Sequence, residues 1–363
     1  MALLIVQGSA LQAQEPATLA IGEPAPAFSL KGIDGETYTL ESFQGAKVLT
    51  LIFTANHCPT AQAYEERMKE LSARYAPGEM QLVAISSNHP GAVCLEELGY
   101  TDLGDSFGEM KVRASDKGYN FPYLYDGDEQ AMATAYGAKA TPHVFIFDRD
   151  RKLRYTGRID DMEDPYRAPT RSDARLAIDA LLAEKEVEVE TTKAFGCSLK
   201  WKSKMDWRKT LDERWKEKPV KVEGIDLEGV TALVGNRSDV YRLINVWATW
   251  CVPCVAELPE FVTINRMYRK RPFELITISM DSPDEMDNAL KTLRQRHVAA
   301  TNYIYSSEDR EAFAEALDSQ WQGPVPYTLL IAPGGEVIYR KLNTIEPLEL
   351  KRAIVERLGR TYK

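Results

Sequence analysis

The clearest chemical motif in the sequence is a pair of cysteines separated by two residues. Cys251 and Cys254 enclose Val252 and Pro253. A β-rich apolar run precedes the pair and a helical pattern follows it, so Cys251 is expected at the start of a helix and Cys254 one turn further in. The backbone N–H groups and the dipole at a helix N-terminus stabilise a thiolate. Such a thiolate can attack a substrate disulfide, and the second cysteine can then resolve the mixed disulfide.

Metal and haem chemistry fit this motif poorly. A structural zinc site needs two further ligands at a matching spacing, and none appears in the sequence. A c-type haem requires a histidine directly after the second cysteine, where this chain has Val255. We therefore expect neither a metal nor an organic cofactor.

Three further cysteines, Cys58, Cys94 and Cys197, are scattered along the chain. Cys58 also precedes a helical pattern, but Ala61 stands where a second C-x-x-C cysteine would be, so no local disulfide can form there. His57 beside it could add positive charge if the two side chains meet. Cys94 is expected to be a small, partly buried residue. Five cysteines in 363 residues are too few for a disulfide scaffold.

The elements that must position Cys58 and Cys251 follow the same order along the chain. This order occurs twice, so the chain holds two copies of one pattern. In each copy a strand-like run precedes the cysteine, and a helix and a second strand follow. An X-Pro bond, Thr141-Pro142 in the first copy and Val325-Pro326 in the second, then precedes two more strands. The expected strands cover residues 47–53, 81–85, 143–147 and 153–157, and then 241–247, 273–278, 327–331 and 336–339. This order predicts an α/β fold with a central mixed β-sheet flanked by helices in each copy.

The repeat divides the chain into four segments. Residues 1–18 form a leader, residues 19–184 a first domain, residues 185–218 a linker and residues 219–363 a second domain. The leader has an apolar run over residues 1–6 and small residues before Gln14, which resemble the core and cleavage site of a secretory signal. This predicts a periplasmic or otherwise exported protein. No apolar run reaches the length of a transmembrane span.

Residues 193–218 of the linker hold Cys197, nine Lys or Arg residues, and Trp201, Trp207 and Trp215. Basic residues interleaved with aromatics can bind nucleic acid or anionic membranes. The whole chain, however, has a formal net charge of −9, which disfavours nucleic acid as a partner. We therefore expect a linker whose tryptophans dock on one or both domains.

The second copy resembles the thioredoxin superfamily, specifically the exported TlpA/ResA-like thiol-disulfide oxidoreductases. The match covers residues 245–259, with Val325-Pro326 at the family's cis-proline position. Thioredoxin itself has an aspartate where this chain has Asn245. The resemblance implies that Cys251 attacks, that Cys254 resolves and that Glu257 assists proton movement at the buried cysteine. It also implies that Pro326 shapes a groove where a substrate strand can pair.

The first copy resembles the redoxin (AhpC/TSA-like) group, particularly its peroxiredoxin-like branch, over residues 22–28, 56–59, 64–67, 121–126, 140–148 and 157–161. A true peroxiredoxin has a threonine three residues before its cysteine and a proline seven before, where this chain has Ala55 and Leu51. Members of the branch also carry a late Gly-Cys-x-x-Lys-Trp, matched by residues 196–201. This implies Cys197 as the partner of Cys58. A disulfide between them would restrict the unfolded chain and so raise its free energy by roughly 4–5 kcal/mol.

These observations predict a tandem of two thioredoxin-like folds that acts as an exported thiol-disulfide oxidoreductase. The expected partners are protein thiol or disulfide clients and a redox partner, either a thioredoxin-like protein or a membrane electron donor. Two alternatives remain open. The protein is a thiol peroxidase whose Cys58 is oxidised by peroxide and reduced by the second domain, or the first domain is a redox-inactive adaptor that binds clients. The direction of electron flow depends on the redox potential of the Cys251–Cys254 pair.

Overall fold

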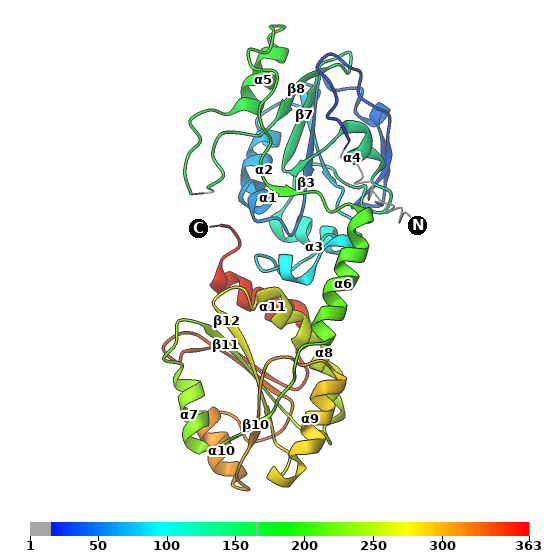
Figure 1. Cartoon of the computed structure of the whole chain (residues 1–363). Helices are drawn as coiled ribbons and strands as arrows, with labels where there is room; N and C mark the ends of the chain where they lie inside the picture. Colours follow the sequence, from blue (N-terminus) through cyan, green and yellow to red (C-terminus); the bar gives the residue numbers. More distant parts are fainter. Residues whose placement is uncertain (1–15, 165, 363) are drawn as a thin grey trace, which may run out of the picture.

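The computed structural model describes residues 16–164 and 166–362 (Figure 1). The expected signal sequence over residues 1–13 lies outside the described residues. The described chain forms two large β-sheets, each covered by helices, with the helix α6 (Met205–Lys216) running alongside from one to the other. The prediction of two α/β units with mixed sheets is confirmed.

The first sheet has seven strands in the order β2-β1-β5-β4-β3-β7-β8. Its central strand β3 pairs in parallel with β4 and antiparallel with β7. Every residue of β3 is buried, as expected for an uninterrupted apolar run covered on both faces. The strands are β1 (Ser29–Gly32), β2 (Thr37–Thr39), β3 (Val48–Thr54), β4 (Met80–Ser86), β5 (Tyr123–Tyr125), β7 (His143–Phe147) and β8 (Leu153–Gly157).

Helices build two apolar clusters against this sheet. One cluster holds buried residues of α2, α3 and α5, and the other holds those of α4. The helices are α1 (Pro59–Ala63), α2 (Glu65–Ala73), α3 (Phe107–Lys117), α4 (Ala131–Tyr136) and α5 (Asp173–Leu182). The prediction of a single helix after Cys58 was wrong, because the helix is interrupted at Tyr64, between α1 and α2. The hydroxyl of Tyr64 lies 2.8 Å from the Asp160 carboxylate and 2.7 Å from the Met162 carbonyl.

The second sheet has six strands in the order β10-β13-β12-β11-β14-β15. The first four are parallel to one another. Strand β14 pairs antiparallel with both of its neighbours, β11 and β15. The strands are β10 (Glu223–Ile225), β11 (Tyr241–Trp247), β12 (Phe273–Ser279), β13 (Thr301–Tyr305), β14 (Tyr327–Ile331) and β15 (Val337–Leu342). The covering helices are α7 (Leu227–Gly235), α8 (Val252–Tyr268), α9 (Met286–Gln295), α10 (Arg310–Leu317) and α11 (Pro347–Leu358).

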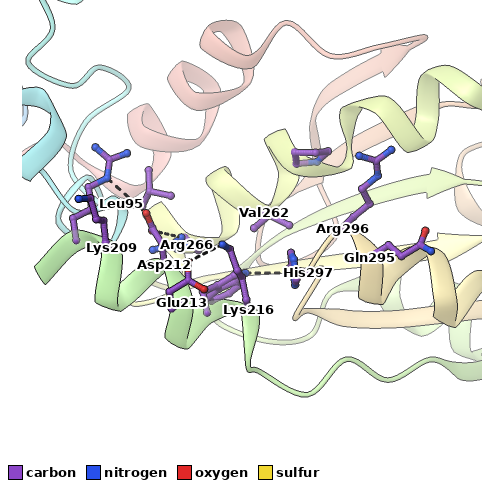
Figure 2. A pocket seen from close by; sticks show the side chains of 13 residues that line it. Leu95, Lys209, Asp212, Glu213, Lys216, Val262, Arg266, Gln295, Arg296 and His297 are labelled. Atoms are coloured by element: carbon purple, nitrogen blue, oxygen red, sulfur yellow. Dashed lines mark hydrogen bonds and ion pairs between the residues drawn. The ribbon is translucent and has the colours of Figure 1, made fainter. Parts of the chain in front are cut away.

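The linker docks on both units. Trp201 packs against the core cluster of the first sheet. Trp215 on α6 is buried, and its indole Nε1–H donates to the carbonyl of His297 at 3.0 Å. Figure 2 shows the neighbouring contact, in which Asp212 of α6 pairs with Arg266 of α8 at 2.7 Å. The prediction of docked tryptophans is therefore confirmed for Trp201 and Trp215 and wrong for Trp207, which keeps 54% of its surface exposed.

Direct contacts also join the two units. They involve the segment between β4 and α3 on one side and the ends of α8 and α11 on the other. The hydroxyl of Tyr268 donates to the carbonyl of Thr101 at 2.7 Å, and Arg266 pairs with Glu96 at 2.9 Å. The buried carboxylate of Asp102 accepts from Arg352 at 3.1 Å and also binds Arg360. Figure 1 shows α11 and the C-terminus next to the first unit.

Candidate functional site

The Cys251–Cys254 pair lies where β11 gives way to α8. Cys251 is the N-cap of α8, and its sulfur accepts a hydrogen bond from the N–H of Cys254 at 3.4 Å. The two sulfur atoms are joined in a disulfide. Cys254 is fully buried, whereas Cys251 keeps 6% of its surface exposed between the exposed side chains of Trp250 and Val252. Cys251 is thus the sulfur that an incoming thiol can reach.

Glu257 follows Cys254 by one turn of α8 and is also buried. Burial raises the pKa of Glu257 to about 7, although its oxygens accept hydrogen bonds from the N–H of Ile345 at 3.0 Å and from the amide of Asn245 at 3.4 Å. The side-chain oxygen of Asn245 has no partner among the described residues. A carboxyl group with this pKa can both hold and release a proton near neutral pH.

Pro326 lies at the same end of the sheet as Cys251. The Val325-Pro326 bond is cis, and β14 begins at the next residue. Tyr327 in β14 pairs with Val246 near the end of β11. Within the described part of the chain, no strand pairs with the residues directly before Pro326.

Cys58 occupies the equivalent place in the first unit, as the N-cap of α1. Its sulfur accepts from the N–H of Ala61 at 3.4 Å and donates to the carbonyl of Thr141 at 3.1 Å. The Thr141-Pro142 bond is also cis. Cys58 is completely buried, so solvent molecules do not reach its sulfur directly.

His57 and Asp105 form a buried pair beside Cys58. The Nδ1 atom of His57 lies 2.5 Å from the carboxylate of Asp105, which also accepts from the side-chain amide of Asn88 at 2.8 Å. Burial would lower the pKa of His57, but the charge of Asp105 outweighs it and raises that pKa. The pKa of Asp105 is held low in turn, since His57 and the hydrogen bonds outweigh the effect of burial. The raised pKa favours the positively charged form of His57 next to Cys58.

Cys197 lies against Cys58 as a free thiol. The short strand β9 (Cys197–Ser198) pairs antiparallel with β6 (Ala140–Thr141), and Cys197 stands opposite Thr141. Burial would raise the pKa of Cys58, but the neighbouring thiol of Cys197 and the charge of His57 outweigh it and lower that pKa. The proximity of Cys58 in turn raises the pKa of Cys197. The structure thus brings together the two cysteines that the resemblance paired, and neither of them is in a disulfide.

Two further side chains that could do chemistry, Cys94 and His143, belong to neither cysteine pair. Cys94 is buried, and burial together with Glu97 raises its pKa to about 11, which makes it a poor nucleophile. His143 is a buried residue of β7 whose Nε2 lies 3.1 Å from the hydroxyl of Thr156, so it packs within the sheet. Burial lowers its pKa to about 4.

A cavity of about 440 Å³ opens beside Cys197, between the two units. Its walls come from the segment between β4 and α3, from residues 197–200, from the end of α8 and from Tyr362. His57 and Cys197 both face it, whereas Cys58 lies behind them. The sequence pointed to neither this cavity nor Asp105, because both depend on contacts between distant segments that no local pattern marks.

The sequence also matches known proteins in both halves of the chain. The sequence profile of the AhpC/TSA family matches residues 21–156 and again residues 220–340. The chain is 27% identical over 117 residues to the thiol-disulfide oxidoreductase ResA of Oceanobacillus iheyensis, a match that covers 30% of this chain and 53% of the relative. It is 27% identical over 109 residues to ResA of Geobacillus kaustophilus, covering 30% and 58%. The chain thus spans little more than half the length of these relatives.

Solved structures with similar sequence include two proteins of unassigned function. A hypothetical protein from Sinorhizobium meliloti is 32% identical and has a TM-score of 0.46, with 52% of this chain and 97% of that chain covered. An uncharacterised conserved protein from Geobacillus kaustophilus is 36% identical and has a TM-score of 0.44, with 50% and 93% covered. Since the family profile matches both halves of the chain and most of the chain's length, the chain belongs to the AhpC/TSA family.

Proposed function

We propose that the protein is an exported thiol-disulfide oxidoreductase that exchanges disulfides with protein clients through Cys251 and Cys254. The observation that carries the proposal is the disulfide at the N-terminus of α8, with the reachable sulfur of Cys251 in front and the buried carboxyl of Glu257 behind. The similarity to ResA thiol-disulfide oxidoreductases supports the same activity.

The reaction in the reducing direction starts from the dithiol. The thiolate of Cys251 attacks one sulfur of the client disulfide and expels the other sulfur, which leaves as a thiolate. Cys254 then loses its proton to Glu257 and attacks Cys251, which releases the second client thiolate and restores the Cys251–Cys254 disulfide. Glu257 suits this role because its pKa is about 7, so it can accept a proton from a buried thiol and pass it on. The oxidising direction is the same sequence reversed.

The edge before Pro326 is the proposed binding site for the client. Residues there have no strand partner in the described chain, and an extended peptide can pair with a free edge of this kind. The exposed indole ring of Trp250 and the exposed side chain of Val252 offer apolar contacts beside Cys251. A redox partner, either a thioredoxin-like protein or a membrane electron donor, would use the same face to restore the active form.

Cys58 and Cys197 form a second redox pair in this proposal. Their contact and the lowered pKa of Cys58 support reversible disulfide formation. Export rests on the signal-like residues 1–13. No helix in the described part of the chain is long and apolar enough to span a membrane.

Reduction of insulin by dithiothreitol, followed by turbidity, tests the main proposal. The wild-type protein is expected to accelerate the reaction, and Cys251→Ser is expected to abolish the acceleration. Cys94→Ser is the matched control, since it removes a buried thiol that lies outside both pairs. Equal acceleration by wild type and Cys251→Ser would refute the proposal.

A thiol peroxidase is the second candidate, because the lowered pKa of Cys58 also favours attack on peroxide. Stopped-flow oxidation of a Cys251→Ser/Cys254→Ser protein by hydrogen peroxide tests it. A rate no faster than that of free cysteine removes this candidate. If instead Cys58→Ser leaves insulin reduction by the full chain unchanged and Cys58 reacts with neither disulfides nor peroxide, the first domain is a redox-inactive adaptor.

A further inference from the structure

The two cis-proline edges of the molecule differ in what covers them. Before Pro326 the edge is free, but before Pro142 it is occupied by the chain itself, since β9 pairs with β6. The contact is close. Gly196 adopts a φ of +138°, and a Cβ atom at this position would lie 2.1 Å from the carbonyl oxygen of Thr141. The linker thus holds Cys197 against Cys58, where an incoming client strand would otherwise present its own sulfur.

This covered edge leaves one described route to the Cys58–Cys197 pair, the cavity between the two units. Its volume of about 440 Å³ is in the range of small-molecule sites. A folded protein that presents a strand would have to displace β9. A small disulfide, by contrast, can enter the cavity and reach Cys197, which lines it.

The charges around the cavity favour an anion. Its two carboxylates are already neutralised, Glu96 by Arg266 at 2.9 Å and Glu97 by Lys200 at 2.5 Å. Two cations remain, and neither has a carboxylate partner among the residues that the structure describes. Lys270 is exposed at the rim. Arg271 donates to the carbonyl of Gly99 at 2.8 Å, and its guanidinium stacks on Tyr100.

The second domain completes this site. Lys270 and Arg271 follow the end of α8, and Tyr362 comes from the C-terminus. The Tyr362 ring packs on Tyr100, with 5.0 Å between the ring centres. Burial and the nearby thiols of Cys197 and Cys58 raise the pKa of Tyr362 to about 12. Its phenol therefore stays protonated as a hydrogen-bond donor at the mouth of the site.

We propose that the interdomain cavity is a binding site for a small disulfide that carries carboxylate groups, and that this disulfide, not a protein, oxidises the Cys58–Cys197 pair. The inference rests on the proposed role of these cysteines as a second redox pair. It adds the class of substrate and a function for the second domain in binding it.

The chemistry balances with the groups present. The proton of Cys197 first moves to the adjacent Cys58 thiolate, a transfer that the two pKa values disfavour, so only a small fraction of Cys197 is a thiolate at any time. That thiolate, which lines the cavity, attacks one sulfur of the small disulfide and expels the first small thiolate. The expelled thiolate takes up the proton from Cys58. Cys58 then attacks the sulfur of Cys197, which forms the Cys58–Cys197 bond and expels the second small thiolate. One disulfide is reduced to two small thiols, one of them as its thiolate, and the two cysteines are oxidised.

The test uses the full chain with Cys251→Ser and Cys254→Ser, so that only the first pair can react. Three disulfides of similar length serve as probes: dithiodipropionate, which is a dianion, hydroxyethyl disulfide, which is neutral, and cystamine, which is a dication. Formation of the Cys58–Cys197 bond is followed by mass spectrometry of non-reduced peptides. The anionic probe is expected to react about threefold to tenfold faster than the neutral one, and the cationic probe more slowly still.

Reversing a charge at the rim of the cavity then tests whether the preference for the anionic probe arises there. Lys270→Glu is expected to remove most of the difference between the anionic and neutral probes. Lys291→Glu makes the same charge change on an exposed lysine of α9, away from the cavity, and is expected to leave the difference unchanged. Equal rates for all three probes, or equal effects of the two variants, would overturn the inference.

Two controls separate this inference from the proposed function. Diamide, a general thiol oxidant, shows whether the pair can form a disulfide at all. If diamide does not join Cys58 and Cys197, the second redox pair itself is refuted. If diamide joins them but insulin with intact disulfides oxidises them as fast as dithiodipropionate does, only the small-disulfide site is refuted.

Discussion

The pKa of Glu257 leads to a prediction that does not depend on knowing any client. Burial raises this pKa from 4.5 to about 7. Between these two values the folded protein keeps a proton on Glu257 that the unfolded chain has already released. The folded state binds more protons there, so the free energy of unfolding falls as the pH rises through this window. Above about pH 7 the full cost is present, and below pH 4.5 it disappears.

The size of the effect follows from the two pKa values. Their difference corresponds to about 3 kcal/mol of unfolding free energy. Screening by solvent reduces this to about 2 kcal/mol. Glu257→Gln cannot ionise and avoids this cost, while its amide oxygen can still accept from Ile345. The variant's amide nitrogen then faces the amide nitrogen of Asn245, so the Asn245 amide must flip to present its unpartnered oxygen as the acceptor. We expect Glu257→Gln to be about 2 kcal/mol more stable than wild type near pH 8, and about equal to it near pH 4.5.

Urea unfolding followed by tryptophan fluorescence at the two pH values measures this difference. Glu260→Gln is the matched control, because Glu260 lies on the same helix and is exposed. It is expected to show no change in stability between the two pH values relative to wild type. A Glu257→Gln protein that is less stable than wild type by the same amount at both pH values would refute the reasoning. The same variant is also expected to flatten the pH dependence of insulin reduction around pH 7.

Three further predictions concern the interface, the first sulfur pair and the linker. Asp102→Asn removes the buried carboxylate that Arg113, Arg352 and Arg360 share between the units, although each arginine keeps a second carboxylate partner; the lost charged hydrogen bonds are expected to lower the free energy of unfolding by about 2 kcal/mol, and a loss below about 0.5 kcal/mol in urea would contradict this. His57→Gln removes positive charge beside Cys58, so the Cys58 thiolate should appear at higher pH in an ultraviolet titration of the Cys251→Ser/Cys254→Ser protein, and an unchanged titration would exclude His57 as the cause. Trp215→Ala should cost about 3 kcal/mol of stability, since the indole is buried and hydrogen-bonded. The exposed Trp207→Ala should cost less than about 0.5 kcal/mol, and similar losses for both would argue against docking of the linker through Trp215.

The sheets were largely predictable because their signals are local. Strands β7, β8, β11 and β14 have the expected bounds, and β3 and β4 are shifted or extended by one residue at their ends. Each is a short apolar run that is buried on both faces and punctuated by turn residues. The two cysteines at helix N-termini followed directly from such runs. The pairs β1–β2 and β10–β13 were not anticipated. Strands β1, β2 and β10 have only three or four residues with at most one buried, and β13, although mostly buried, has the sequence TNYIY, which is not an uninterrupted apolar run.

The surroundings of the first sulfur pair were not predictable from local patterns. Asp105 is separated from His57 by 48 residues, and nothing near Asp105 marks it as the partner of a histidine. Tyr362 reaches the same site from the far end of the chain. Strand β9 has only two residues, too few for any periodicity. Such contacts depend on how two complete domains pack, and this is decided by ion pairs such as Arg266–Glu96 that no sequence spacing reveals.

Helix α8 separates the two sulfur pairs. Cys251 caps its first turn, while Met267 near its last turn lines the same cavity as Cys197. At the rise of an α-helix these two points are about 24 Å apart, whereas disulfide exchange requires that sulfur atoms touch. Within one molecule in this arrangement the pairs cannot exchange directly, and the covered edge before Pro142 keeps a second protein molecule away from Cys58 and Cys197. Without a small thiol or disulfide to carry electrons between them, each pair should therefore stay at its own potential, as two insulated redox couples on one chain.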